Sequence, residues 1–253
     1  MKTEVITLNK ERNVTLTVCV QDIGGEYGFQ VRPAVLVIPG GSYLMCSDRE
    51  AEPVALAYAC AGYQTFVLRY TVGDICAWPM PLEDYEAAMA LIHKNAEIWH
   101  VDPDRIAVVG FSAGGHLAAC TATIARQKPA AAVLVYPVIF PVASILPAIM
   151  AEGKPELPAP HQCVDSTTCP CFFAAARDDK TVDVKNALAM QQALLEHGIP
   201  FESHIYARGG HGFSTAASHV LRTAACARTK NWVDDSIGWL EEQFGVLTYE
   251  GFR

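Results

Sequence analysis

Ser112 has the surroundings of an activated nucleophile. It lies at the centre of Gly110-Phe111-Ser112-Ala113-Gly114, which follows the strand-like run 105–109 and precedes an alanine-rich segment with helical character. Between a strand and a helix, G-x-S-x-G is typical of a tight turn that lifts a serine hydroxyl clear of a sheet. Because the serine backbone is strained in such a turn, bulky neighbours would collide with the strand or the helix. A chain with 18 glycines produces such pentapeptides by chance, so it is the context that favours a nucleophile.

A base and an orienting acid follow this serine, each at the end of a predicted strand. Asp178 and Asp179 come directly after the apolar run 171–176. His211 has glycines on both sides and follows the alternating run 201–206. Serine, then aspartate, then histidine is the chain order of α/β-hydrolase triads and differs from two common serine-protease orders. The sequence therefore predicts a catalytic triad, with the two aspartates as alternative acids.

An oxyanion hole is predicted early in the chain. Residues 34–38 have the pattern of a buried strand, and Pro39-Gly40-Gly41-Ser42-Tyr43 follows at once. Backbone N–H groups of this loop, with the N–H of Ala113, would bind the negative oxygen of a tetrahedral intermediate. One such donor is worth about 10²–10³ in rate. The loop alone would suit a plain glycine turn, but its position two strands before the nucleophile favours the oxyanion hole.

Together these motifs resemble the small esterases of the α/β-hydrolase superfamily. The nearest branch is the acetylxylan-esterase-like and feruloyl-esterase-like one, close to the prolyl-oligopeptidase and dienelactone-hydrolase groups, and the resemblance covers roughly residues 33–245. Such enzymes are metal-free serine hydrolases that cleave short acyl groups, often acetyl, from sugars or small alcohols. The segments that carry the resemblance are 39–43, 102–106, 110–117, 179–182 and 209–213.

This resemblance implies a role for each residue of the triad. Ser112 is the nucleophile, His211 the general base and Asp179 the carboxylate that orients the base. Asp179 is preferred to Asp178 because such enzymes show an Asp-x-x-Val pattern, which Asp179-Lys180-Thr181-Val182 fits. The implied reaction is two-step acyl transfer on a small-molecule ester, with no cofactor and no metal. A lipase or thioesterase would use the same triad, and a hydrolase-fold protein that binds a ligand without turnover is a further alternative.

The resemblance also implies which groups donate to the oxyanion. They are the backbone N–H groups of Gly41, Ser42 and Ala113. The early loop departs from the usual His-Gly-Gly-Gly, since Pro39 takes its first position and Ser42 its last. A donor at Ser42 therefore requires a backbone conformation that is open to a residue with a Cβ.

Strands and helices alternate along the chain. Such alternation predicts the α/β-hydrolase fold, with a doubly wound, mostly parallel sheet, helices on both faces and ligands at the carboxyl ends of the strands. Asp84 is predicted to cap a helix whose apolar stripe continues to Trp99. The expected strands are 14–20, 34–38, 65–68, 105–109, 133–136, 171–176 and 201–206, and further helices are expected at 50–61, 183–197 and 231–244.

Composition suggests one compact enzyme domain over residues 1–253. The chain is 51% hydrophobic with a mean hydropathy of +0.17, which argues against disorder. Its net charge of −8 disfavours nucleic acid as a partner, because phosphates need basic surfaces. Residues 130–150 carry no charge, but three prolines interrupt them, so we expect a strand rather than a membrane anchor. The apolar residues beyond this strand form either a minimal lid or acyl-binding surface or ordinary packing, and these residues are Ile139, Phe140, Ile145, Leu146, Ile149 and Met150. Homo-oligomerisation stays open.

The nine cysteines are an odd number scattered through the chain. Residues 1–5 carry an acid and no apolar run, so we expect no signal peptide and a reduced cytoplasmic protein with mostly buried thiols. Thiols in apolar patterns, at positions 19, 60 and 120, are expected in the core. A zinc site is the less favoured interpretation of a local cluster, because Pro170 separates its last two thiols. That cluster consists of His161, Cys163, Cys169 and Cys171.

Overall fold

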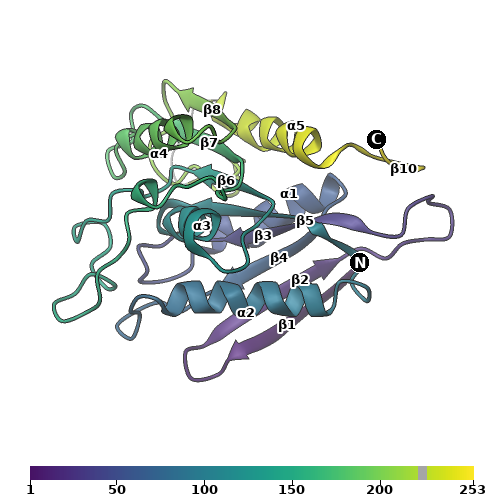
Figure 1. Cartoon of the computed structure of the whole chain (residues 1–253), viewed down its shortest axis with the longest axis horizontal. Coiled ribbons are helices and arrows are strands. Elements are labelled where there is room, and N and C mark those ends of the chain that lie inside the picture. Colours follow the sequence, from purple (N-terminus) through teal and green to yellow (C-terminus); the bar gives the residue numbers. More distant parts are fainter. Residues whose placement is uncertain (222–226) are drawn as a thin grey trace.

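One mixed sheet of eight strands forms the centre of the computed structural model, which describes residues 1–221 and 227–253 (Figure 1). The strand order is β1-β2-β4-β3-β5-β6-β7-β8. β2 is antiparallel to both of its neighbours, β1 and β4, whereas β4, β3, β5, β6, β7 and β8 are parallel to one another. The strands are β1 (Lys2–Asn9), β2 (Val14–Val20), β3 (Arg32–Ile38), β4 (Gln64–Arg69), β5 (Val101–Phe111), β6 (Ala131–Val135), β7 (Cys171–Ala176) and β8 (Phe201–Tyr206).

Helices cover both faces of this sheet (Figure 1). One core contains side chains of α2, α3 and α4, and the other contains those of α1 and α5. The helices are α1 (Glu52–Cys60), α2 (Met80–Lys94), α3 (Ser112–Ile124), α4 (Lys185–Glu196) and α5 (Trp232–Phe244). A short C-terminal hairpin of β9 (Leu247–Thr248) and β10 (Gly251–Phe252) pairs separately from the sheet. The predicted α/β architecture is confirmed.

The central strands supply both cores in strict alternation. In β3, Leu36 points into the first core, whereas Val35 and Val37 point into the second. In β5, Val108 points into the first core and Val109 points into the second. Because side chains alternate between the faces of a strand, a strand covered on both faces is apolar along its whole length. This explains why the central strands were recognisable in the sequence as continuous apolar runs.

The strand order creates a place for a site between β3 and β5. From β3 the chain continues through α1 to β4 on one side, whereas from β5 it continues through α3 to β6 on the other. The two connections diverge, so the carboxyl ends of β3 and β5 flank a topological switch point, where α/β sheets bind ligands. Both loops singled out above, 39–43 and 110–114, begin there.

The prediction for Asp84 was wrong. Helix α2 begins at Met80, one turn earlier, and Pro81 occupies its first turn, where the missing N–H of proline costs nothing. Asp84 is buried inside the helix, where its carboxylate accepts hydrogen bonds from the Thr71 N–H (2.8 Å) and from Arg12 (2.6 Å). The helix ends at Lys94, so Trp99 packs in the core from beyond it.

Two further features differ from expectation. Cys60, the last residue of α1, is exposed, because it lies on the solvent side of the helix end, whereas Cys19 and Cys120 are buried as predicted. Cys226 lies outside the described residues. Strand β1 was not predicted, because only one of its edges is paired and none of its side chains is fully buried.

Most of the uncharged segment 130–150 packs into the protein. Its start forms β6, a parallel strand between β5 and β7, as predicted. Ile139, Leu146 and Ile149 are fully buried, so for them ordinary packing is the correct interpretation, whereas Phe140 is 37% exposed. Asn186 of α4 holds this segment by accepting the N–H groups of Ile139 and Phe140, both at 2.8 Å.

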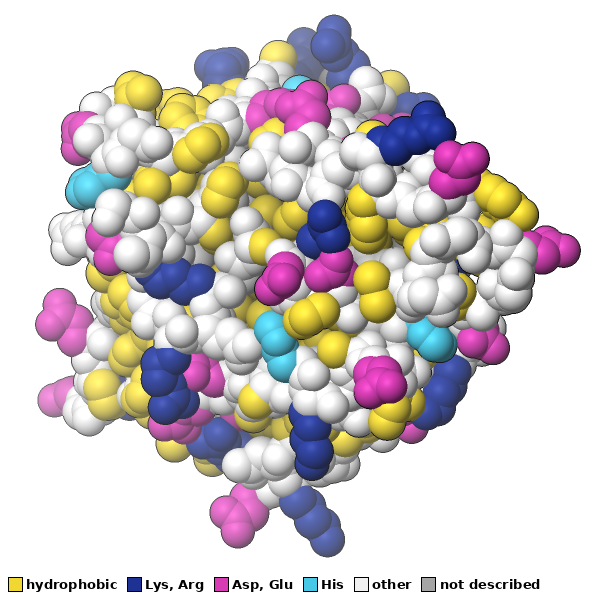
Figure 2. Space-filling model, turned by 45° about the vertical axis from the view of Figure 1, so that its right-hand side comes forward, with side chains coloured by type: hydrophobic (Ala, Val, Ile, Leu, Met, Phe, Trp, Pro, Cys, Tyr) yellow, Lys and Arg dark blue, Asp and Glu magenta, His cyan; other side chains and the backbone are white. Residues whose placement is uncertain are grey.

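The surface is charged and mixed in sign. Figure 2 shows acidic and basic side chains interspersed with hydrophobic ones on the face that it presents, without a basic stripe there. Among the helices of the described residues, none has both the length and the apolar character that a membrane span requires.

Candidate active site

Ser112 stands at the junction of β5 and α3, where the predicted turn is found. It is the first residue of α3 and has a φ of 52°, in the left-handed region that residues with a Cβ rarely adopt. The turn is closely packed, because a Cβ added at Gly114 would lie 2.2 Å from the Ile38 carbonyl oxygen and 2.3 Å from that of Pro39. Glycine is therefore required at position 114, where the turn meets the loop after β3.

A chain of hydrogen bonds joins Ser112, His211 and Asp179. The His211 Nδ1 lies 2.7 Å from Asp179 Oδ2, and His211 Nε2 lies 2.9 Å from Ser112 Oγ. An ionised carboxylate only accepts, so Nδ1 carries the proton and Nε2 accepts the serine hydroxyl. The other carboxylate oxygen of Asp179 accepts the N–H groups of Thr181 (2.8 Å) and Val182 (2.9 Å). The carboxylate is thus fixed from one side and orients the imidazole from the other.

Asp178, the alternative acid, has a different place. Its Oδ1 accepts the N–H groups of Gly209 and Gly210, both at 2.9 Å, and it does not bond to His211. The hydrogen bond from Gly210 is the main reason why the pKa of Asp178 lies below its ordinary value. The structure therefore brings Asp179 to the histidine and uses Asp178 to tie down the loop that holds it.

The loop after β3 lies directly against Ser112. A Cβ added at Gly40 would lie 3.0 Å from the Ser112 Cβ. Gly41 has a φ of +131°, and its carbonyl accepts the N–H groups of Leu44 (2.9 Å) and Met45 (3.2 Å). Ser42 has a φ of 58°, so the left-handed conformation demanded of a residue with a Cβ is adopted here, at a cost of about 1–3 kcal/mol.

The oxyanion assignment stays a prediction for Gly41, Ser42 and Ala113. Its support is that the loop bearing Gly41 and Ser42 and the first turn of α3 bearing Ala113 are in contact beside Ser112. The N–H groups in the first turn of a helix have no partner within the helix, so that of Ala113 can donate to a group outside it.

His116, one turn after Ser112, is a packing residue. It is fully buried, with Nε2 at 2.8 Å from the Pro158 carbonyl oxygen and Nδ1 at 2.8 Å from the Tyr43 hydroxyl. A carbonyl oxygen only accepts, so Nε2 carries the proton and Nδ1 accepts from Tyr43. The neutral imidazole thus joins α3 to the loop after β3 and to the loop around Pro158.

This buried imidazole makes stability depend on pH. Burial lowers the pKa of His116 to about 4 from an ordinary value near 6.5. Because the unfolded chain then binds the proton more tightly, the stability that His116 contributes above about pH 6.5 is lost as the pH falls towards 4. The loss amounts to roughly 3 kcal/mol.

The variant His116→Gln tests this dependence. A glutamine amide can still donate to the Pro158 carbonyl but does not titrate in this range. Urea unfolding at pH 7, 5.5 and 4.5 should give a flatter dependence of the free energy of unfolding on pH for the variant than for the wild type. Parallel curves would show that His116 is not the titrating group.

Sequence reasoning missed two polar residues beside the site. Glu50 and Tyr136 are both buried, and the Tyr136 hydroxyl donates to Glu50 Oε1 at 2.7 Å. The only signals were a tyrosine at the carboxyl end of the predicted strand 133–136 and an acid next to a glycine-rich loop. Neither signal reveals that residues 86 positions apart form a pair.

The local His/Cys cluster is not assembled. His161 contacts the Phe140 ring at 5.0 Å between centroids, whereas the Cys163 thiol lies beside the Ala159 carbonyl. Cys169 and Cys171 are buried near one another at the start of β7. Within residues 1–221 and 227–253, no three His, Cys, Asp or Glu side chains are grouped so that they could hold a metal ion.

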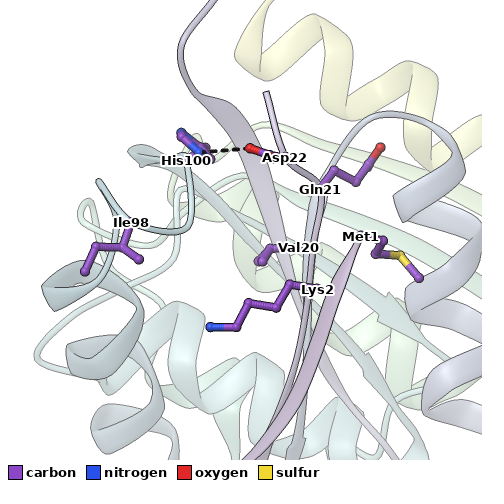
Figure 3. A pocket seen from close by; sticks show the side chains of 7 residues that line it. All are labelled: Met1, Lys2, Val20, Gln21, Asp22, Ile98 and His100. Atoms are coloured by element: carbon purple, nitrogen blue, oxygen red, sulfur yellow. Dashed lines mark ion pairs between the residues drawn. The ribbon is translucent and has the colours of Figure 1, made fainter. Parts of the chain in front are cut away.

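A surface cavity of about 370 Å³ lies away from this chemistry, beside the start of β1. Figure 3 shows Lys2, Gln21 and Ile98 around it and the ion pair between Asp22 and His100 (3.7 Å). None of its lining residues belongs to the hydrogen-bonded chain at Ser112. The catalytic interpretation therefore rests on the geometry of side chains and not on the volume of a cavity.

Known proteins resemble this chain over most of its length. A model of the BD-FAE family matches residues 26–134. The crystal structure of MGS-M1, an alpha/beta hydrolase enzyme from a Medee basin deep-sea metagenome library, is 39% identical with a TM-score of 0.86, covering 96% of this chain and 98% of that one. An acetyl ester-xyloside bifunctional hydrolase from Caldicellulosiruptor lactoaceticus is 31% identical with a TM-score of 0.82, covering 94% and 96%.

A curated relative agrees with these structures. The acetylxylan esterase of Xylanibacter ruminicola is 29% identical over 218 residues, which are 79% of this chain and 45% of that protein. The chain spans less than half the length of this acetylxylan esterase (45%) and of a second curated relative (33%).

Proposed function

The chain belongs to the acetylxylan-esterase-like carboxylesterases of the α/β-hydrolase superfamily, and from that membership we propose that it is a serine esterase that hydrolyses short-chain acyl esters of carbohydrates or small alcohols. The observation that carries the proposal is the continuous chain of hydrogen bonds from Asp179 through His211 to Ser112. It supplies a nucleophile, a base whose unprotonated nitrogen faces the serine hydroxyl, and an acid that holds this tautomer.

The reaction proceeds in two steps. His211 Nε2 takes the proton of Ser112 as Oγ attacks the ester carbonyl carbon, and the N–H groups of Gly41, Ser42 and Ala113 receive the negative charge on the carbonyl oxygen. The tetrahedral intermediate collapses to an acyl-serine, and the alcohol leaves with the proton from His211. A water molecule then attacks the acyl carbon and gives a proton to His211; the second tetrahedral intermediate collapses, His211 returns that proton to Ser112 Oγ, and the acid is released.

The electrostatics of the site suit this sequence. The Asp179 side chain is almost entirely buried and stabilises the imidazolium that forms in each step. Because the imidazole acts as a base only when it is neutral, activity should rise as the pH increases.

The segment that follows β6 favours a short acyl group. Ile139, Leu146 and Ile149 are buried in the core. Little apolar surface beyond Phe140 and Val142 therefore remains in this segment to contact a long acyl group. A carbohydrate alcohol is favoured by the printed descriptions of the relatives, which include an acetylxylan esterase and an acetyl ester-xyloside hydrolase.

Initial rates on p-nitrophenyl acetate, butyrate and octanoate test this specificity. We expect kcat/KM on acetate to exceed that on octanoate by at least about tenfold, because a pocket without room for extra methylenes excludes them. Release of acetate from acetylated xylo-oligosaccharides then tests the alcohol side. Equal or higher kcat/KM on octanoate would favour a lipase-type enzyme. An absence of both ester turnover and labelling of Ser112 by a serine-directed phosphonate would favour a binding protein.

A further inference from the structure

Glu50 places a carboxyl group in the core directly behind the nucleophile. Its side chain is 4% exposed, and Oε2 accepts the N–H of Gly40 at 2.9 Å. A Cβ added at Gly40 would lie 2.7 Å from Oε2 on one side and 3.0 Å from the Ser112 Cβ on the other. Glu50 Oε2 and the Ser112 Cβ therefore both border the side of Gly40 on which a side chain would stand. A buried acid is costly to desolvate, so its retention here needs a reason.

Tyr136 connects the same carboxyl group to the base. Its hydroxyl donates to Glu50 Oε1 at 2.7 Å and accepts the N–H of Ser214 at 3.0 Å. Its ring packs against the His211 ring at 4.9 Å between centroids, with an interplanar angle of 61°. Tyr136 thus contacts the catalytic imidazole with its ring and fixes the end of the His211 loop with its hydroxyl.

The two residues join parts of the site that come from distant segments. Glu50 holds the beginning of the loop with the oxyanion donors, and Tyr136 holds the loop of the base. These loops follow β3 and β8, which are separated in the sheet by β5, β6 and β7. A rate of acyl transfer depends on the distance between base, nucleophile and oxyanion donors, and a shift of about 1 Å can cost 10²-fold.

We propose that Glu50 and Tyr136 are positioning residues for ester hydrolysis, which fix the oxyanion loop and His211 relative to one another through the hydrogen-bonded path Gly40–Glu50–Tyr136–Ser214. This inference rests on the proposed function. Both carboxylate oxygens accept hydrogen bonds, so Glu50 acts as an anion, and its charge favours the imidazolium that His211 forms in each step.

Several charged or titratable groups face this path. Arg49 adjoins Glu50 in the 48–50 turn, Tyr136 follows β6, and His211 with its partner Asp179 comes from the loops after β8 and β7. Burial raises the pKa of Glu50, whereas the hydrogen bonds from Tyr136 and Gly40 and the charges of His211 and Arg49 oppose that rise. Because the negative charge of Glu50 favours the imidazolium form of His211, replacement of Glu50 by a neutral residue should move the acid limb of the pH–activity profile to lower pH.

The variants Glu50→Gln, Tyr136→Phe and the double variant test the proposal on p-nitrophenyl acetate. We expect each single variant to lower kcat about tenfold with KM changed less than about threefold, because alignment for the chemical step is lost and not substrate binding. The double variant should lose little more than the worse single one, since both break the same path. Only Glu50→Gln should move the acid limb of the profile.

Tyr58→Phe is the matched control. Tyr58 is also a fully buried tyrosine, and its hydroxyl shares a 2.6 Å hydrogen bond with Ser236 away from Ser112. Its loss should lower the melting temperature as much as Tyr136→Phe does, with kcat unchanged. A kcat within twofold of wild type in folded Glu50→Gln and Tyr136→Phe would overturn the proposal, and so would an equal loss of kcat in the control.

Two further readouts separate this proposal from the proposed function. If wild type hydrolyses no ester, the esterase function fails, and the rate at which a p-nitrophenyl phosphonate labels Ser112 replaces kcat. Slower labelling in both variants then supports the positioning role, and equal labelling overturns it. If Glu50→Gln does not fold, Tyr136→Phe decides alone, because it removes a single oxygen atom and retains the ring against His211.

Discussion

Replacing Ser112 by alanine is expected to lower kcat on p-nitrophenyl acetate by roughly 10⁴–10⁶-fold. The change removes Oγ, the atom that would attack the carbonyl carbon and that shares a hydrogen bond with His211 (2.9 Å). The residual rate would come from substrate binding and the oxyanion donors, which act without a nucleophile.

The fold should tolerate this change. Ser112 is 6% exposed, and alanine is smaller than serine and keeps the Cβ that already lies beside Gly40. Unchanged circular dichroism and a melting temperature within a few degrees of wild type would show that the loss is chemical. Turnover that survives in Ser112→Ala would contradict the triad and with it the proposed mechanism.

Asp179→Asn is expected to lower kcat by roughly 10³–10⁴-fold. Oδ1 accepts two backbone N–H groups, from Thr181 and Val182, so the amide oxygen takes that side and the NH₂ group faces His211. An NH₂ group donates, so Nδ1 of His211 must become the acceptor, and the proton moves to Nε2. The imidazole then presents N–H to Ser112 instead of a lone pair and cannot take the serine proton.

Asp178→Asn provides the matched control for that loss. Its Oδ1 accepts from Gly209 and Gly210, and an asparagine oxygen can accept both hydrogen bonds as well. We expect its kcat to stay within about fivefold of wild type, because only the charge on these two hydrogen bonds is removed. A larger loss in Asp178→Asn than in Asp179→Asn would reverse the assignment of the acid. Measuring kcat against pH for both variants shows whether the acid limb of the pH–activity profile has moved or only the maximal rate has changed.

The fold and the chemical side chains were readable from the sequence for a physical reason. Parallel strands covered on both faces must be apolar throughout, and the site of such a sheet lies where its strands end. Ser112 and Asp179 follow strands of this kind, whereas His211 follows the edge strand β8, which its alternating pattern revealed, so locating the strands located all three residues. Their roles stay a proposal until the variants are measured.

Contacts between segments far apart in the chain were not readable in this way. The Asp84 carboxylate resembled a helix cap because nothing local reveals that Thr71 and Arg12 bind it in the core. The pair of Glu50 and Tyr136 depends on the order of strands in the sheet, which local patterns do not determine. Strand β1 gave a weak signal because an edge strand buries little of its surface.

The connection from β6 to β7 has an evolutionary consequence. Residues 137–170 leave the sheet after one strand and return in its neighbour, and Ser112, Asp179 and His211 all lie elsewhere in the chain. On the proposed function, insertions or deletions in this connection can reshape the surroundings of the acyl group without altering the spacing of Ser112, Asp179 and His211. Substrate preference can then diverge rapidly among descendants of one ancestor while the chemistry is inherited unchanged, as expected when specificity and catalysis are encoded in separate stretches of one gene.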